Sequence, residues 1–390
     1  MSEVVIAGIG QVKVEEHWEK SIRELALAAI LAAREDAVGL QPQALFVGNM
    51  LAAQLSRQSH LGALVADFSG LTGIEAVTIE ASGSSGGAAL RAGFMAVASG
   101  QVETALVLGL EKMTDTVGTS IEAALATNND SDYESVHGVT LTAQAAMLMR
   151  RYMHEFQVPQ NAFAGFPVIA HLNGASNPNA LFRKAISTDI YNKSGVVSDP
   201  LNIFDIAPNA DGAAAVILTR GKHLPHSYPH RLVRIAGSSL VTDTLALHNR
   251  PDPLVFNASR LSIERACLKA HLSTMQIDFF ELYDAYSIFA ALILEAAGYS
   301  NRGEGWKLAQ NANLPAPVSL TGSLPISTFG GLKARGNPGG ATGVYQAVEV
   351  VLQLRGQAGK NQVDGARRGM IQCLGGPAST AVTHILEALD

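Results

Sequence analysis

The sequence feature that most constrains the fold is the stretch Thr78–Gly93, TIEASGSSGGAALRAG. It starts inside a β-branched, apolar run typical of a strand, continues with small residues over 81–87, and then begins a good helix at 88–91. We therefore predict a strand, a tight turn and a helix in direct succession. Such a turn presents N–H groups that can hold an oxyanion, and it is where a nucleophile would lie. The alternative is a plain turn whose small residues only permit close packing.

Apolar runs alternate with helical patterns along the rest of the first half. Strands are predicted at residues 4–9, 44–48, 104–109 and 211–218, and helices at 25–34, 60–68 and 88–98. Ser21 and Glu24 form a capping-box pattern at the start of the first helix, and Gly100 is a natural C-cap of the third. This alternation predicts an α/β fold with a largely parallel sheet.

Composition changes after Met113, and residues 114–198 hold polar clusters around one strong helix at 142–155. We interpret this stretch as a loop subdomain inserted over the sheet, a location that often builds an active site. The segment Gly221–His230 is the best linker candidate. The predicted domains are therefore residues 1–220, which include the loop subdomain, and residues 231–390.

The second half repeats features of the first. Strands are expected near 231 and 279 and as a pair over 369–385, and helices at 260–270, up to 298, and at 345–354. A glycine-rich turn leads into a small-residue helix in each half, at Gly86-Gly87-Ala88 and at Gly339-Gly340-Ala341. This similarity suggests a duplication.

Bulk composition excludes several classes of function. Of 390 residues, 47% are hydrophobic and 16% charged, which is typical of a compact fold, and the formal net charge of −6 with no basic patch argues against nucleic acid. No apolar run approaches the roughly 18–20 residues of a membrane span, and MSEVVIAGIG is typical of a first strand and not of a signal peptide. Two cysteines form neither a disulfide framework nor a metal site, so we expect a reducing cytoplasm.

Four segments in the same order resemble loops of the thiolase superfamily. The stretch Thr78–Gly93 resembles the nucleophile turn E-A-A-C-A-S-G-G, with Gly83 in the place of the cysteine, and Asp205–Ala215 resembles the strand that closes the N-terminal half. Gly330–Gly343 resembles the loop that contains G-H-P, and Met370–Ser379 resembles the C-x-G-G loop. The segment ELYDAYS, residues 281–287, resembles the archaeal and lipid-transfer-type branch.

The resemblance implies a five-layered α-β-α-β-α fold built from two similar halves, with an inserted loop subdomain. It also implies candidate residues position by position. Gly83 leaves the nucleophile position without a thiol, Tyr283 replaces the His or Asn that polarises a thioester carbonyl, and Asn337 replaces the histidine that activates the cysteine. Cys373 matches the second cysteine, an acid/base, although a small buried residue in a tight loop is an equal alternative.

Further residues are candidates for substrate binding, namely Ser82, Ser84, Gly330, Gly331 and Gly376. Lys333 and Arg335 either meet CoA phosphates or are solvated loop charges. Tyr283 can donate a hydrogen bond to an oxyanion or act as an acid or base, and Asn337 can donate but cannot take a proton at neutral pH.

The favoured function is that of an acyl-CoA enzyme acting at a C–C bond next to a thioester without an acyl-cysteine, as the tyrosine-dependent retro-aldolases of this branch do. The alternatives are an inactive thiolase-like subunit that binds acyl-CoA or a partner, and an ordinary acetyl-CoA acetyltransferase. The resemblance implies a CoA thioester ligand and no covalent cofactor or metal. It also implies a homodimer or tetramer and an accessory protein of the zinc-ribbon/OB-fold type.

Overall fold

A nine-stranded sheet forms the framework of the protein. The computed structural model describes residues 3–310 and 316–389. In order across the sheet, the strands are β3 (Glu75–Ile79), β2 (Ala44–Gly48), β4 (Thr104–Glu111), β7 (Gly212–Arg220), β1 (Val4–Gln11), β8 (Val233–Thr242), β11 (Thr380–Ala388), β10 (Arg368–Gly375) and β9 (Phe279–Glu281).

The sheet is mixed, so the prediction of a largely parallel sheet is wrong. Strand β2 pairs in parallel with β3 and β4, and β9 pairs in parallel with β10, whereas the central strands from β4 to β10 pair antiparallel. The reason is that β11 follows β10 through a short turn, without the helical crossover that parallel strands need. Strand β7 likewise enters between β1 and β4 in the opposite direction.

The two halves have the same strand order. In the first half it is β3-β2-β4-β7-β1, and in the second it is β9-β10-β11-β8, with the missing edge strand represented by a parallel bridge between Phe280 and Ile326. The halves meet where β1 pairs with β8 at Val5 and Arg234. The similarity expected from the two glycine-rich turns is therefore present in the topology.

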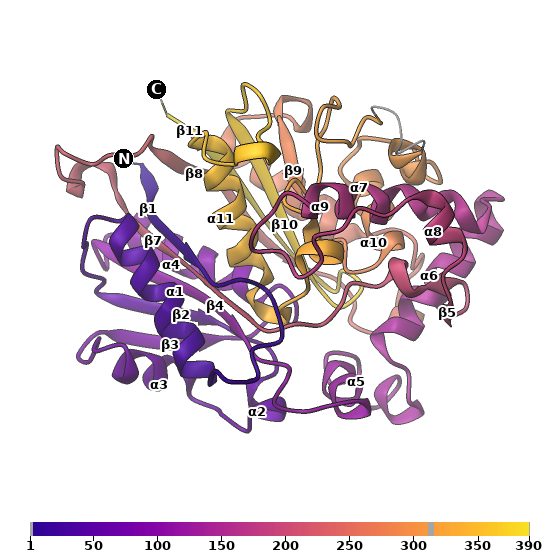
Figure 1. Cartoon of the computed structure of the whole chain (residues 1–390), viewed down its shortest axis with the longest axis horizontal. Coiled ribbons are helices and arrows are strands. Elements are labelled where there is room, and N and C mark those ends of the chain that lie inside the picture. The colour runs from indigo at the N-terminus through magenta and orange to yellow at the C-terminus, as the bar shows by residue number, and fades with distance from the viewer. Residues whose placement is uncertain (1–2, 311–315, 390) are drawn as a thin grey trace.

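Helices cover both outer faces and fill the space between the halves. Helices α1 (Ile22–Asp36) and α3 (Leu61–Phe68) pack on the first half, and α9 (Asn257–Ala270), itself in contact with α10 (Ser287–Ala296), packs on the second. Helices α4 (Ser85–Ser99) and α11 (Thr342–Leu354) lie between them, against strands and each other (Figure 1). The two halves of the sheet are the two β layers, and the outer and middle helices are the three α layers. This is the five-layered α-β-α-β-α arrangement that the resemblance implies.

Local signals set several helix ends. Ser21 and Glu24 form the capping box that starts α1, as predicted. Gly100 ends α4 in a left-handed conformation, also as predicted, but α4 begins at Ser85, three residues earlier than expected. The earlier start places the whole Ser-Gly-Gly run inside the helix, so the turn itself is confined to residues 80–84.

Glycines allow α4 and α11 to touch through their backbones. A Cβ added at Gly343 would lie 2.3 Å from the backbone nitrogen of Gly87, and one added at Gly86 would lie 2.8 Å from the carbonyl oxygen of Gly340. No side chain fits at these positions without movement of the backbone. The two glycine-rich turns are therefore packed directly against each other in the middle layer.

The segment between β4 and β7 forms a small helical layer of its own (Figure 1, magenta). It contains α5 (Thr119–Ala126), α6 (Leu141–Phe156), α7 (Gly165–Gly174), α8 (Thr188–Asn192) and the strand pair β5 (Val196–Ser198) and β6 (Leu201–Asn202). The short helix α2 (Ala52–Leu55) contacts α5. The domain boundaries at 220 and 231 stay a prediction. Within residues 3–310 and 316–389, no helix is long and apolar enough to cross a membrane.

The glycine contact predicts that Gly343→Ala destabilises the protein. Alanine gains about 1 kcal/mol over glycine in an exposed helix, but here its methyl group overlaps the Gly87 backbone. We expect a net loss of about 2 kcal/mol in the free energy of unfolding, measured by urea denaturation. Gly195→Ala is the control because no atom lies within 4 Å of the added Cβ. Equal stability of the two variants would contradict the packing argument.

Candidate active site

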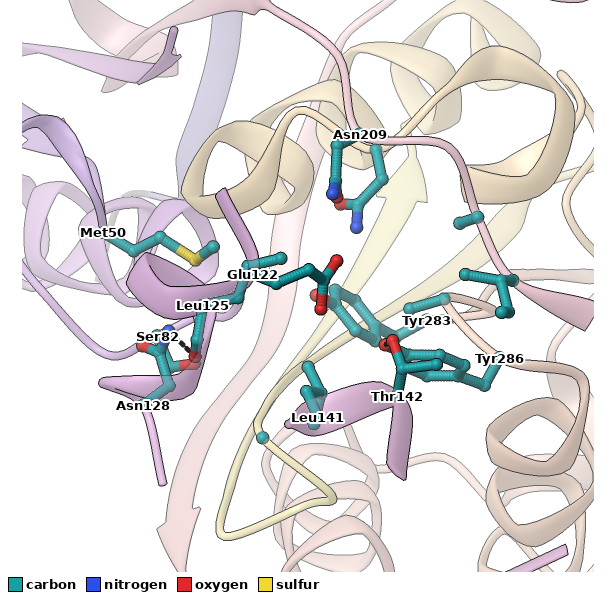
Figure 2. Close-up of a pocket in the computed structure, with 16 residues that line it drawn as sticks. Met50, Ser82, Glu122, Leu125, Asn128, Leu141, Thr142, Asn209, Tyr283 and Tyr286 are labelled. Atoms are coloured by element: carbon teal, nitrogen blue, oxygen red, sulfur yellow. Dashed lines mark hydrogen bonds between the residues drawn. The ribbon is translucent and has the colours of Figure 1, made fainter. Parts of the chain in front are cut away.

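Segments from both halves and from the inserted layer enclose one pocket, which we call the tyrosine pocket. It lies at the turn after β3, the segment after β9, the glycine-rich loop and the turn after β10, and its free space is about 30 Å³. This volume admits only a few water molecules. The lining residues are Met50, Ser82, Gly83, Glu122, Leu125, Asn128, Leu141, Thr142, Ile206, Ala207, Asn209, Tyr283, Ala285, Tyr286, Asn337 and Gly376 (Figure 2).

The Tyr283 hydroxyl lies where a side chain at position 83 would begin. A Cβ added at Gly83 would be 2.2 Å from Tyr283 Oη and 2.7 Å from the carbonyl oxygen of Leu374. Atoms never approach so closely without movement, so position 83 accepts only glycine while Tyr283 holds this orientation. The Tyr283 hydroxyl therefore occupies the space that a thiol-bearing side chain at position 83 would need.

Buried carboxylates hold the segment that carries Tyr283. The Glu281 carboxylate accepts a hydrogen bond from the Thr328 backbone N–H at 2.9 Å, and the Asp284 carboxylate accepts one from Leu332 N–H at 2.7 Å. The side-chain amide of Gln346, on α11, donates to the carbonyl oxygen of Glu281 at 3.0 Å. The residues on either side of Tyr283 are thus fixed, which limits the movement of its ring.

Burial determines the protonation of the two tyrosines in the pocket. Tyr283 is 4% exposed, and desolvation raises its pKa above the usual value of a tyrosine, so its hydroxyl is a donor and not a base at neutral pH. Tyr286 also has a pKa raised by burial, and its hydroxyl lies 2.9 Å from Thr142 Oγ1. Tyr286 is not among the residues expected from the sequence, although its place in ELYDAYS, at the strand-to-helix turn, is a usable signal.

Asn337 reaches the same pocket from the glycine-rich loop. Its side-chain oxygen accepts a hydrogen bond from the Gly339 backbone N–H at 3.2 Å, and its backbone is held by Pro208 and Ala210. These contacts orient the side chain so that its NH₂ group remains for a ligand. Gly83, Tyr283 and Asn337, which are far apart in the chain, therefore line the same pocket.

The other predicted substrate-binding residues divide into two groups. Ser82 and Gly376 line the tyrosine pocket, whereas Ser84, Gly330 and Gly331 do not. Ser84 is fully buried, and its hydroxyl donates to the Ala81 carbonyl oxygen at 2.6 Å, so it stabilises the turn. Both glycines have positive φ angles, of 104° and 52°, and are buried in the loop fold. A Cβ on Gly331 would lie 2.4 Å from the Asp284 carboxylate, which explains that glycine by packing.

Cys373 lies on β10 behind the pocket and is not among its lining residues. Its sulfur would be 2.3 Å from a Cβ added at Gly87 and 3.0 Å from one added at Gly343. The thiol is completely buried, and desolvation raises its pKa to about 12. The geometry favours the packing alternative over the acid/base alternative.

The alternative that Lys333 and Arg335 are solvated loop charges is wrong. The two side chains are each 1% exposed, and neither lines the tyrosine pocket. Lys333 donates to the Asp205 carbonyl oxygen at 2.8 Å, and Arg335 forms a buried ion pair with Glu349 at 3.4 Å. The sequence signal misled because charges in a glycine-rich loop are usually at the surface, whereas this loop runs through the interior.

Other polar side chains of the first half, Asn49, His137 and His171, lie outside the tyrosine pocket. Asn49 donates to the buried Glu111 carboxylate at 2.8 Å, and His137 ends a short 3₁₀ turn outside the tyrosine pocket. His171 lines a separate, mainly apolar cavity of about 330 Å³, and burial lowers its pKa. Among the described residues, no group of three or more His, Cys, Asp or Glu is placed to hold a metal ion.

Comparison of the fold with solved structures finds a close match. The chain aligns with the Ltp2–ChsH2(DUF35) aldolase with a TM-score of 0.83, over 99% of this chain and 98% of that chain, at 24% sequence identity. At this identity, the likeness concerns the fold. Two stacked, similar halves with a site between their glycine-rich turns define the class of thiolase-fold proteins.

Sequence comparison then gives the family. Residues 4–222 match the model of the thiolase N-terminal domain, and residues 239–388 match the thiolase C-terminal domain-like model. The chain belongs to the thiolase family. It is 40% identical to an acetyl-CoA acetyltransferase of Methanothermobacter thermautotrophicus, over 99% of this chain and 100% of the relative. It is also 29% identical to bovine (Bos taurus) sterol carrier protein 2, over 80% of this chain and 59% of the relative.

The contact between positions 83 and 283 predicts an energetic coupling. Gly83→Ala should lower the free energy of unfolding by about 2 kcal/mol, because its methyl group overlaps Tyr283 Oη and the Leu374 carbonyl. Tyr283→Phe removes the first overlap, so the double variant should recover about 1 kcal/mol of that loss. Urea denaturation of the four proteins measures this coupling.

Tyr286→Phe provides the matched control, since this tyrosine lines the same pocket but does not contact the added methyl group. It should not rescue Gly83→Ala. Full stability of Gly83→Ala alone, or equal rescue by either tyrosine variant, would show that the side-chain position at 83 is not filled by Tyr283.

Proposed function

We propose that this protein acts on a carbon–carbon bond next to a CoA thioester without an acyl-cysteine intermediate, in the manner of a retro-aldolase. The observation that carries the proposal is the Tyr283 hydroxyl, which fills the side-chain position at Gly83. Acyl transfer through cysteine needs a thiol at that position. Cleavage of a β-hydroxy thioester needs donors for the thioester oxygen and a group that moves a proton.

In this proposal the donors are Tyr283 and Asn337. The protonated Tyr283 hydroxyl and the Asn337 NH₂ group bind the thioester oxygen and stabilise the negative charge that develops on it when the bond to the α-carbon breaks. Backbone N–H groups near Gly83 and Gly376 are further donors, since both residues line the pocket. Cys373 takes no part, because it lies behind the pocket.

The comparisons support this proposal to different degrees. The thiolase family supports a CoA thioester as ligand, and the similar solved structure is named an aldolase with a second component, ChsH2(DUF35). On that basis we propose that this chain forms a homodimer or tetramer and associates with an accessory protein. The name of the 40% identical relative, acetyl-CoA acetyltransferase, favours the alternative of acyl transfer, but Gly83 offers no thiol for it.

The test uses 3-hydroxyacyl-CoA thioesters of increasing length, with the released carbonyl compound and the shortened acyl-CoA measured by mass spectrometry. We expect cleavage by the wild type and about a hundredfold lower rate for Tyr283→Phe, because one oxyanion donor is lost. Intact-protein mass spectrometry should detect no acyl-enzyme.

Calorimetric binding of acetyl-CoA distinguishes the alternatives. Binding without any cleavage would favour the inactive thiolase-like subunit, and a trapped acyl-enzyme with thiolysis of acetoacetyl-CoA would favour the acetyltransferase. If no CoA ester binds, the thioester site itself is refuted.

A further inference from the structure

Glu122 brings a carboxylate into the tyrosine pocket from the inserted layer. It lies on α5, whose Ala124 and Leu125 pack in a small apolar cluster with Leu51, Leu55 and Met113. This cluster fixes the helix against α2 and leaves Glu122 on the face toward the pocket. In Figure 2 its side chain points toward the ring of Tyr283.

The Glu122 carboxylate has no structural task that explains its position. Within the described part of the chain, no hydrogen bond or ion pair involves its side chain, and it is only partly exposed. Other carboxylates near the site are engaged. Glu111 accepts bonds from the backbones of Met50 and Gly340, and Asp284 accepts one from Leu332. An unpaired, partly buried carboxylate is costly unless it serves a ligand.

Among the described residues that line the pocket, Glu122 alone carries a carboxylate. Tyr283 and Tyr286 are protonated there because burial raises their pKa values. The amides of Asn337, Asn209 and Asn128 do not titrate. A reaction that moves a proton in this pocket therefore has one available base.

We propose that Glu122 is the acid–base residue of the tyrosine pocket, an inference that rests on the function proposed above. Its carboxylate accepts the proton of the substrate β-hydroxyl, and the O–H electron pair forms the new C=O bond. The bond between the α- and β-carbons breaks, and its electron pair moves to the α-carbon and the thioester oxygen, where Tyr283 and Asn337 donate hydrogen bonds. Glu122 then returns the proton to the α-carbon. The products are a carbonyl compound and a shortened acyl thioester, and no further reactant is consumed.

The reverse of the last proton transfer, in which Glu122 removes a proton from the α-carbon, can be measured without cleavage of a substrate. With acetyl-CoA in D₂O, the wild type should exchange the α-hydrogens for deuterium, followed by mass spectrometry. Glu122→Gln should slow this exchange at least about a hundredfold and leave acetyl-CoA binding unchanged, and Glu122→Asp should retain part of the rate. Glu35→Gln is the matched control, since Glu35 is exposed on α1 and does not line the pocket.

The pH profile gives a second readout. The titratable groups that face Glu122 are the hydroxyls of Tyr283 and Tyr286, and α2, which packs against α5, carries no charged residue. Burial raises the Glu122 pKa, so the wild-type exchange rate should rise with pH through a value above that of an ordinary glutamate. Glu122→Gln should lose this rise.

The outcomes separate the inference from the function on which it rests. If the wild type and Glu122→Gln exchange the α-hydrogens at the same rate, the role of Glu122 is overturned and the proposed function stays intact. Wild-type binding of acetyl-CoA with no exchange, together with no cleavage of 3-hydroxyacyl-CoA, overturns both. Equal loss in Glu122→Gln and Glu35→Gln also overturns the inference, because the effect would then come from charge in general.

Discussion

The backbone contact between α4 and α11 is the constraint on which the rest of the structure depends. Glycines on both helices remove the side chains that would separate them, so the two halves stack at the closest distance that backbones allow. The turn before α4 carries Gly83 and the loop before α11 carries Asn337, and the stacking brings these residues into one pocket. A hydrogen bond from Gly340 N–H, in the turn before α11, to the buried carboxylate of Glu111 at the end of β4, at 3.1 Å, also links the two halves. The site therefore exists only because the halves are packed together.

Beneath the pocket, a buried set of charges supports the glycine-rich loop. Lys333 and Arg335 are surrounded by Glu281, Asp284 and Glu349, and Arg335 also lies over the ring of Tyr345 at 5.1 Å. Burial raises the pKa of Glu349 and lowers that of Lys333, because charge is costly in the interior, whereas Arg335 beside Glu349 and Asp284 beside Lys333 shift the two pKa values back toward the charged forms. Opposite charges offset that cost only in a fixed arrangement. This arrangement holds the loop, and with it Asn337 and the segment of Tyr283, in a single position.

The sequence predicted the elements that glycines and apolar runs delimit, and four ordered loops named Gly83, Tyr283 and Asn337 as candidates, but only the structure shows that they line one pocket. The sequence could not give the strand directions, because β7 and β11 look like any other apolar run. It did not show that Lys333 and Arg335 are buried, since burial of a charge depends on partners distant in the chain. It missed Glu122 because a glutamate on a short loop helix is locally ordinary. Only the packing of α5 against α2 turns that residue toward the tyrosines.

The Tyr283 hydroxyl beside Gly83 also limits how this protein can change during evolution. A cysteine at position 83 would strain the protein as a single substitution, because its side chain would overlap Tyr283 Oη and the Leu374 carbonyl. Replacement of Tyr283 alone would remove a donor of the proposed mechanism without supplying a nucleophile, and the Asn337 amide, which takes no proton at neutral pH, would not serve a new cysteine as a base. Each single step toward the cysteine-dependent chemistry thus passes through a protein that is strained or lacks a working group. A change between the two chemistries would therefore need several substitutions together.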